Sequence, residues 1–216
     1  MIVTNTALAM IEKSHSNMPI EHLDRIVAIC DVLQSELVET SESYKNYFSH
    51  PGDKENFLEA VQYHDIGKAL IEQAVINKTS AISEDDYELM KSHVMGGLEE
   101  VDRAIQQGHI TGERRIKFIR ECILFHHERW DGTGYPQGAR EIDIPHSARI
   151  LAIADTYDSA MSPRPWKDAL STTEIYEYIV SESGISFDPS AVVAFKKTHD
   201  VIEELYPQEP KRVMAQ

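Results

Sequence analysis

The sequence predicts an all-α protein, a single-domain helical bundle, and three observations support this prediction. Apolar residues recur at intervals of three and four along most of the chain. No alternation of apolar and polar residues is long enough to indicate a sheet. Helix-capping residues precede several of the apolar patterns. The chain has 216 residues, 42% of them hydrophobic, which is enough for one substantial core.

The first two helices are predicted before residue 70. One spans residues 20 to about 40, where apolar side chains repeat at helical spacing, and the polar stretch 41–52 after it is predicted to be a loop. The next begins near Pro51-Gly52-Asp53, with Asp53 as its N-cap, and is expected to continue through His64 toward Gly67.

The remaining helices are predicted from their caps and breakers. Ser83-Glu84-Asp85-Asp86 resembles a capping box and opens a helix that Gly108 ends. A helix over about 113–128 leads into a glycine- and proline-rich loop at 131–138. An apolar helix runs from Pro145 to the breaker Pro163-Arg164-Pro165, and two more follow the cap residues at 171–174 and 188–189. Residues 1–19 are predicted to be an N-terminal helix or extension, 20–205 the domain, and 206–216 a C-terminal tail.

The charge balance limits the classes of function. With 21 Lys and Arg against 36 Asp and Glu, the net charge of −15 disfavours a nucleic-acid polymer as partner. A small anionic substrate is still compatible, because bound metal ions can invert the local potential. No run approaches the ~20 apolar residues of a membrane helix, and no signal pattern is present, so a cytoplasmic location is expected. Cys30 and Cys122 are predicted to be core residues.

Several histidines and aspartates fall on core-facing stripes of the predicted helices. They are His22, His64, Asp65, His93, His126 and Asp155. A single core-facing histidine is most simply a buried residue with a hydrogen-bond partner. Five helices that all direct an imidazole or a carboxylate inward are better explained by one metal centre.

The ligand types narrow the chemistry of this predicted centre. Imidazole and carboxylate without thiolate suit manganese, iron, nickel, zinc or magnesium. The adjacent pairs His64-Asp65 and His126-His127 would point roughly 100° apart on a helix, so that each pair could serve two ions. Two such ions suit phosphoester hydrolysis.

The motifs resemble the HD-GYP subgroup of HD-domain phosphohydrolases over about residues 20–170. His64-Asp65-Ile66-Gly67-Lys68 is similar to its H-D-x-G-K element, and the run 126–136 (HHERWDGTGYP) to its H-H-E-x-x-D-G-x-G-Y-P signature. His93, Asp155 and Arg164-Pro165-Trp166-Lys167 follow the order of the remaining elements, with Trp166 in place of the usual Tyr or Phe.

The resemblance implies a set of metal ligands and catalytic residues. The implied ligands are His64, Asp65, His93, His126, His127 and Asp155, with His22 as a further ligand. Asp65 is expected to bridge two ions, and Asp65 and Lys68 to be catalytic. Met18 stands where some members carry a glutamate for a third ion, so two ions are expected rather than three, with Glu21 as the neighbouring alternative. Iron or manganese is favoured, and magnesium, nickel and zinc are alternatives.

Contacts to the substrate are implied for Lys68, Arg164 and Lys167, whose charges suit a phosphate. Tyr135 either shapes the substrate pocket or only rigidifies its turn. Glu128 is expected, with Asp131, to orient the loop.

The function implied by the resemblance is hydrolysis of cyclic di-GMP by metal-activated hydroxide, to the linear dinucleotide or to GMP. One alternative is another cyclic dinucleotide, such as cyclic GMP-AMP, or a different nucleotide phosphoester. A second is a catalytically weak nucleotide sensor that signals through a partner protein. A regulatory or signalling protein partner is also expected, because members of the family usually carry a regulatory domain and only residues 1–19 precede the first core helix.

Overall fold

The computed structural model describes residues 20–76, 78, 83–162 and 169–206, and their regular structure is helical. In these ranges one isolated bridge, between Ser183 and Phe187, is the single β-type pairing. The elements are α2 (Ile20–Thr40), α3 (Glu42–Tyr47), α4 (Asp53–Val61), η1 (Ile66–Leu70), α5 (Gln73–Ile76), α6 (Glu84–Gln106), α7 (Glu113–Phe125), η2 (Glu141–Asp143), α8 (His146–Met161), α9 (Thr172–Ser181) and α10 (Pro189–Glu203). The all-α prediction is confirmed. Within the described part of the chain, no helix has both the length and the apolarity to cross a membrane.

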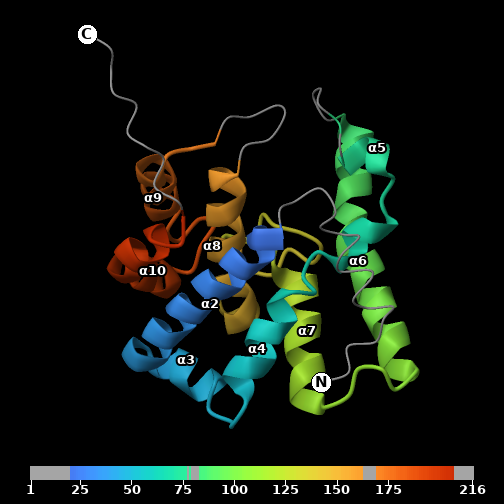
Figure 1. The fold of residues 1–216 in the computed structure, drawn as a ribbon, viewed down its shortest axis with the longest axis horizontal. Helices are drawn as coiled ribbons and strands as arrows, with labels where there is room; N and C mark the ends of the chain where they lie inside the picture. Colours follow the sequence, from blue (N-terminus) through green and yellow to red (C-terminus); the bar gives the residue numbers. More distant parts are fainter. Residues whose placement is uncertain (1–19, 77, 79–82, 163–168, 207–216) are drawn as a thin grey trace.

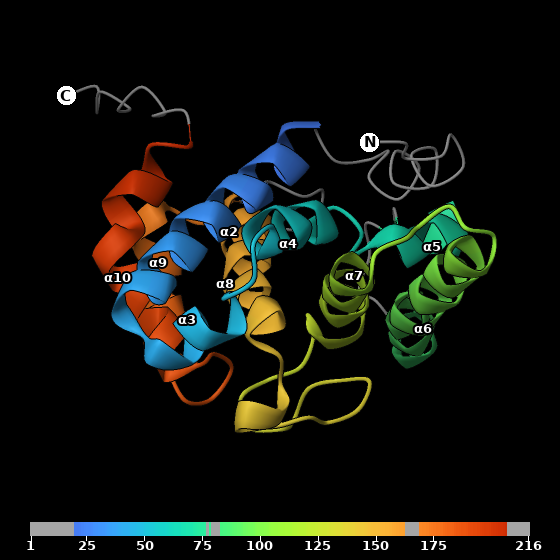
Figure 2. The ribbon, with the colours of Figure 1, turned by 90° about the horizontal axis from the view of Figure 1, so that it is seen from below.

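The helices form a bundle around the pair α2 and α8, which pack against each other (Figure 1). Helices α9 and α10 cover one end of this pair, whereas α4 and α7 pack together on the other side (Figure 2). Helix α6 lies beyond α7 and holds η1 against its surface. One cluster of buried apolar side chains runs from α2 to α10, and both cysteines are free and buried in it.

The predicted starts of α6, α9 and α10 are confirmed by their capping residues. Ser83 accepts a hydrogen bond from Asp86 N, and Ser171 accepts one from Glu174 N, each with the reciprocal contact of a capping box. Asp188 accepts from Ser190 N ahead of α10. Such caps satisfy amide groups that the first helical turn leaves unpaired.

Four of the predictions about where helices begin and end are wrong. The stretch 41–52 contains α3, which buries the ring of Tyr44. Helix α4 begins after Gly52, so Asp53 is its first residue rather than its N-cap, and it ends at Val61 rather than near Gly67. Helix α7 ends at Phe125. The histidines that follow α4 and α7 therefore lie at helix ends and not inside helices.

Asp53 links α4 to α7 and gives the fold an acid-sensitive contact. Its side chain is 1% exposed, accepts from Arg114 Nε (2.8 Å) and from His50 N (3.0 Å), and also pairs with Arg114 Nη2. Burial raises the pKa of Asp53, but Arg114 and the His50 amide outweigh this effect and lower it below its usual range. A carboxylate with a lowered folded pKa adds stability above its unfolded pKa, and that stability is lost as the pH falls through the folded pKa.

Asp53→Asn is therefore expected to lower the free energy of unfolding at neutral pH by about 1–3 kcal/mol. The difference from the wild type should shrink when urea unfolding is repeated at successively lower pH, as the pH falls through the lowered pKa of Asp53 and the wild-type carboxylate takes up a proton. A difference that stays the same over this whole pH range would mean that the charge of Asp53 contributes nothing.

Candidate metal centre

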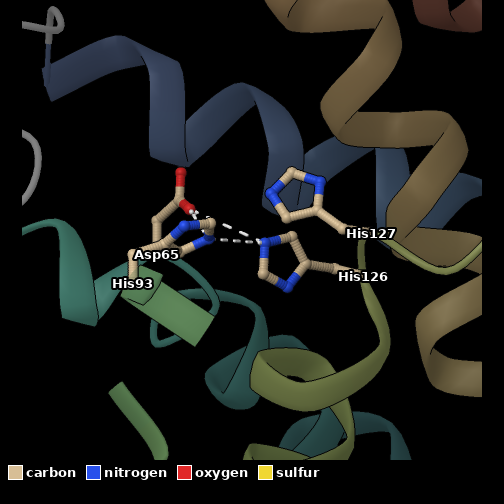
Figure 3. A group of neighbouring side chains, drawn as sticks. All are labelled: Asp65, His93, His126 and His127. Carbon is tan, nitrogen blue, oxygen red and sulfur yellow. Dashed lines mark hydrogen bonds and ion pairs between the residues drawn. The ribbon is translucent and has the colours of Figure 1, made fainter. Parts of the chain in front are cut away.

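Four potential ligand side chains converge between three segments of the fold (Figure 3). Asp65 lies in the turn between α4 and η1, His93 lies on α6, and His126 and His127 follow α7. One ligand atom from each of the four lies within 4.8 Å of the others. Asp65, His93 and His126 are at most 3% exposed. The fold thus gathers a compact set of nitrogen and oxygen donors, three of them buried and His127 partly exposed.

Backbone contacts select the tautomer of three histidine rings. Each ring places Nδ1 against a carbonyl oxygen of the preceding helical turn: His64 on Val61 (2.7 Å), His93 on Met90 (2.6 Å), and His126 on Cys122 (2.8 Å) and Ile123 (2.9 Å). Because a carbonyl only accepts, Nδ1 donates its hydrogen and a neutral ring keeps its lone pair on Nε2.

The lone pairs of two of these rings face each other. The Nε2 atoms of His93 and His126 lie 3.4 Å apart. Two nitrogens that bind one divalent ion at about 2.1 Å in tetrahedral geometry also lie about 3.4 Å apart. This spacing, and the polarity of the donor set, fit a shared metal ion.

The electrostatics favour uncharged rings at His126 and His127 beside a charged Asp65 carboxylate. Burial, reinforced by neighbouring imidazoles, lowers the pKa of His126 although Asp65 opposes the shift. Burial, together with the neighbouring rings of His126 and His93, places the pKa of His127 well below its usual range. For Asp65, burial is outweighed by Lys68 and His64, which hold its pKa well below the usual range. Neutral imidazole and ionised carboxylate are the forms that bind metals.

Asp65 stands between this group and a second pair of potential ligands. Its Oδ1 lies 3.3 Å from His93 Nε2 and 3.6 Å from His126 Nε2, yet receives no hydrogen bond from the described residues. Its Oδ2 lies 3.3 Å from His64 Nε2, which is 4.0 Å from Asp155 Oδ1. The two carboxylate oxygens of Asp65 therefore face two separate donor groups.

Gly67 allows the segment that carries Asp65 to approach α6. A Cβ atom on Gly67 would lie 1.9 Å from the carbonyl oxygen of His93 and 2.6 Å from the amide nitrogen of Gly97. No side chain fits there, because both neighbours are backbone atoms. The glycine was expected to lie near the end of a helix, and the structure gives it a further role in the approach of Asp65 to His93.

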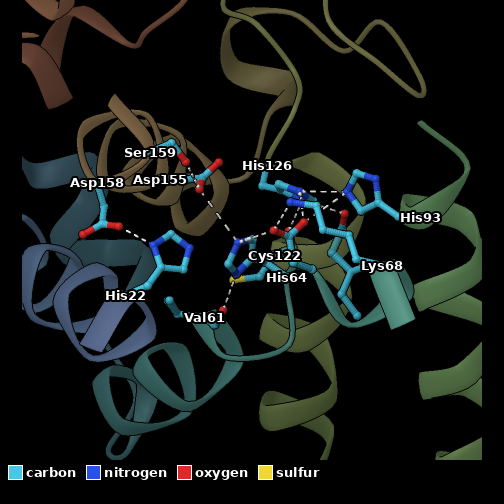
Figure 4. Close-up of polar contacts among 12 residues, drawn as sticks. His22, Val61, His64, Lys68, His93, Cys122, His126, Asp155, Asp158 and Ser159 are labelled. Atoms are coloured by element: carbon cyan, nitrogen blue, oxygen red, sulfur yellow. Dashed lines mark hydrogen bonds and ion pairs between the residues drawn. The ribbon is translucent and has the colours of Figure 1, made fainter. Parts of the chain in front are cut away.

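His22 lies outside the four-residue group and pairs with Asp158 on α8 (Figure 4). The carboxylate of Asp158 is fully buried and also accepts from Arg25 Nε (2.5 Å) and Tyr206 Oη (2.7 Å). Burial raises the pKa of Asp158, but His22 and Arg25 outweigh it and lower that pKa. Asp158 was not predicted as a site residue from the sequence, although its spacing of three from Asp155 on an apolar helix was a signal. The assignment of His22 as a ligand stays a prediction.

Two of the predicted substrate contacts adjoin the group. Lys68 pairs with Asp65 Oδ2 from within η1. The ring of Tyr135 stacks on His127, with centroids 4.7 Å apart and planes inclined by 25°. Arg164 and Lys167, like Met18, lie outside the described residues.

The loop after His127 is held by its own carboxylates. Glu128 is buried, and its Oε1 accepts from Gln137 N (2.7 Å). Asp131 Oδ1 accepts from the amide (2.9 Å) and the hydroxyl (2.6 Å) of Thr133. Both carboxylates thus shape the loop that carries Tyr135.

Comparisons with known proteins agree with this geometry. The model of the HD domain family matches residues 33–191. The chain is 35% identical over 73% of its length to a cyclic di-GMP phosphodiesterase of Thermotoga maritima, and 33% identical over 88% to a probable cyclic di-GMP phosphodiesterase of Vibrio cholerae. It spans 42% of the length of each of these two relatives.

A solved structure supports the fold assignment. A cyclic GMP-AMP specific phosphodiesterase of Vibrio cholerae superposes with a TM-score of 0.57 at 18% identity, over 94% of this chain and 51% of the other. The family match covers most of the chain, and the motif residues His64, Asp65, His93, His126 and His127 meet at one place in the fold. The chain therefore belongs to the HD domain family, in its HD-GYP group.

Proposed function

We propose that the chain is a metal-dependent phosphodiesterase that hydrolyses cyclic di-GMP to the linear dinucleotide, to GMP, or to both. The observation that carries this proposal is the convergence of the Asp65 carboxylate with three imidazoles within 4.8 Å. The printed activities of the Thermotoga and Vibrio relatives support the choice of substrate.

The proposed centre would hold two divalent ions, iron or manganese, and Asp65 would serve both of them. His93, His126 and His127 would serve one ion, and His64 with Asp155 the other, with His22 as a further ligand. When bound, the ions would polarise the phosphoryl group and supply an activated water. Lys68, held by Asp65, is placed to offset phosphate charge, and we assign Arg164 and Lys167 the same role.

The test is to incubate manganese- or iron(II)-reconstituted protein with cyclic di-GMP and to separate the products by chromatography. We expect linear dinucleotide or GMP, and no product after treatment with a chelator. A parallel reaction with cyclic GMP-AMP distinguishes the competing substrate. Nucleotide binding without turnover with any metal would contradict the proposal and favour a sensor.

A further inference from the structure

A row of aromatic side chains leads from the candidate metal centre to the protein surface. Tyr135 stacks on His127 and donates its backbone amide to the carbonyl of His127 (3.2 Å). Beyond it, the ring of Tyr87 meets Tyr135 edge to face, with centroids 6.5 Å apart and planes inclined by 76°. The row thus starts at His127, a potential metal ligand, and ends at the solvent-exposed ring of Tyr87.

The Lys91 ammonium lies over the rings of both Tyr87 and Tyr135. Lys91 Nζ is 5.0 Å from the ring centroid of Tyr87 and 5.8 Å from that of Tyr135. Its ion-pair partner Glu88 (2.5 Å) is 63% exposed and Lys91 itself 26%, and solvent-accessible pairs of this kind contribute little free energy. The ammonium can therefore turn toward a ligand at low cost.

The backbone holds this group in a fixed position relative to the centre. Tyr87, Lys91 and His93 all lie on α6, whose start is secured by the Ser83 capping box. The Tyr87 side chain is 50% exposed, whereas core tyrosines such as Tyr157 are fully buried. Core packing therefore leaves half of the Tyr87 ring available for contact.

We propose that Tyr87, Lys91 and Tyr135 form a subsite that binds one nucleobase of a nucleotide phosphodiester whose phosphate lies at the centre. This inference rests on the proposed function and adds a specificity determinant to it. Each base has a flat π-face that stacks on an aromatic side chain. The Lys91 ammonium suits the carbonyl edge of a purine or a phosphate oxygen, in a protein whose net charge is −15.

The test measures binding of a hydrolysis-resistant phosphorothioate analogue of cyclic di-GMP to metal-reconstituted protein by titration calorimetry. Tyr87→Ala is expected to raise Kd about tenfold, and Tyr87→Phe, which keeps the ring, to leave Kd within about twofold of the wild type. Lys91→Gln should weaken binding about threefold and reduce its dependence on salt. Tyr178→Ala is the matched control, because Tyr178 is 43% exposed and lies on α9.

Turnover of cyclic di-GMP by the metal-reconstituted wild type separates this inference from the proposed function, because binding of the analogue is measured without any hydrolysis. If Tyr87→Ala binds the analogue as tightly as the wild type, or if the wild type does not bind it, the subsite is wrong. If binding responds as expected but the wild type does not cleave cyclic di-GMP, the proposed hydrolysis fails and the subsite stands.

Discussion

Gly67→Ala is expected to dismantle the candidate metal centre and to lower the free energy of unfolding by about 3 kcal/mol or more. The added Cβ would lie 1.9 Å from the His93 carbonyl oxygen, and no side-chain movement can relieve a clash with backbone. The η1 segment would have to move away from α6, which separates Asp65 from His93. Urea unfolding and metal analysis of the purified protein measure the two effects.

Gly96→Ala is the matched control for this prediction. Gly96 lies on α6 close to the same contact, but its added Cβ would meet only Leu70 Cδ1, at 3.0 Å. Leu70 is 55% exposed and its side chain can turn aside. Since alanine favours a helix over glycine by about 1 kcal/mol, this variant should be neutral or slightly more stable. Equal behaviour of the two variants would refute the close-approach argument.

Asp65→Asn is expected to remove most bound metal and to reduce kcat/KM of the proposed cyclic di-GMP hydrolysis on the order of a thousandfold. The amide keeps the size of the carboxylate but loses its charge and one acceptor oxygen. That charge is the counterpart of Lys68, and its two oxygens face both donor groups. Metal content per chain and steady-state kinetics at saturating metal measure the losses separately.

Asp102→Asn makes the same chemical change away from the centre. Asp102 is 39% exposed and pairs with Arg120 at the surface of α6, so metal content and kinetics should match the wild type. Circular dichroism should show that the Asp65 variant keeps its helices. A fully loaded and active Asp65 variant would exclude this carboxylate as a ligand.

The helices with clear periodicity and caps were predictable from the sequence, whereas α3 was not. Its six residues show no apolar repeat, and its one buried side chain is Tyr44. Tyr44 donates to Asp188 Oδ2 (2.8 Å), far along the chain. A tertiary contact of this kind specifies the short helix. The local pattern of apolar residues gives no sign of such a contact, so the helix could not be predicted from it.

The identities of the clustered ligands were predictable, but their place relative to the helices was not. The apolar spacing that leads to His64 and His126 is the same whether a helix continues or ends there. Both rings instead donate to carbonyls of the last helical turn, Val61 for one and Cys122 with Ile123 for the other. A side chain that competes in this way for terminal carbonyls cannot be recognised from periodicity.

The partners of the predicted residues were the hardest to foresee. Asp158, which pairs with His22, and Tyr87, which meets Tyr135, depend on how α8 packs on α2 and how α6 packs beside the loop. Side chains that function through such contacts become visible once the packing of the helices is known.

The ligand group joins three segments that are far apart in the sequence: the turn after α4, the middle of α6 and the end of α7. An ion bound there would act as a cross-link that only the folded chain can form. The free energy of metal binding would therefore add to the free energy of unfolding. At a free metal concentration of 100 times Kd, this linkage adds about 2.7 kcal/mol to stability. A shortage of metal would then make the protein more susceptible to proteolysis, in addition to leaving the centre without its ions.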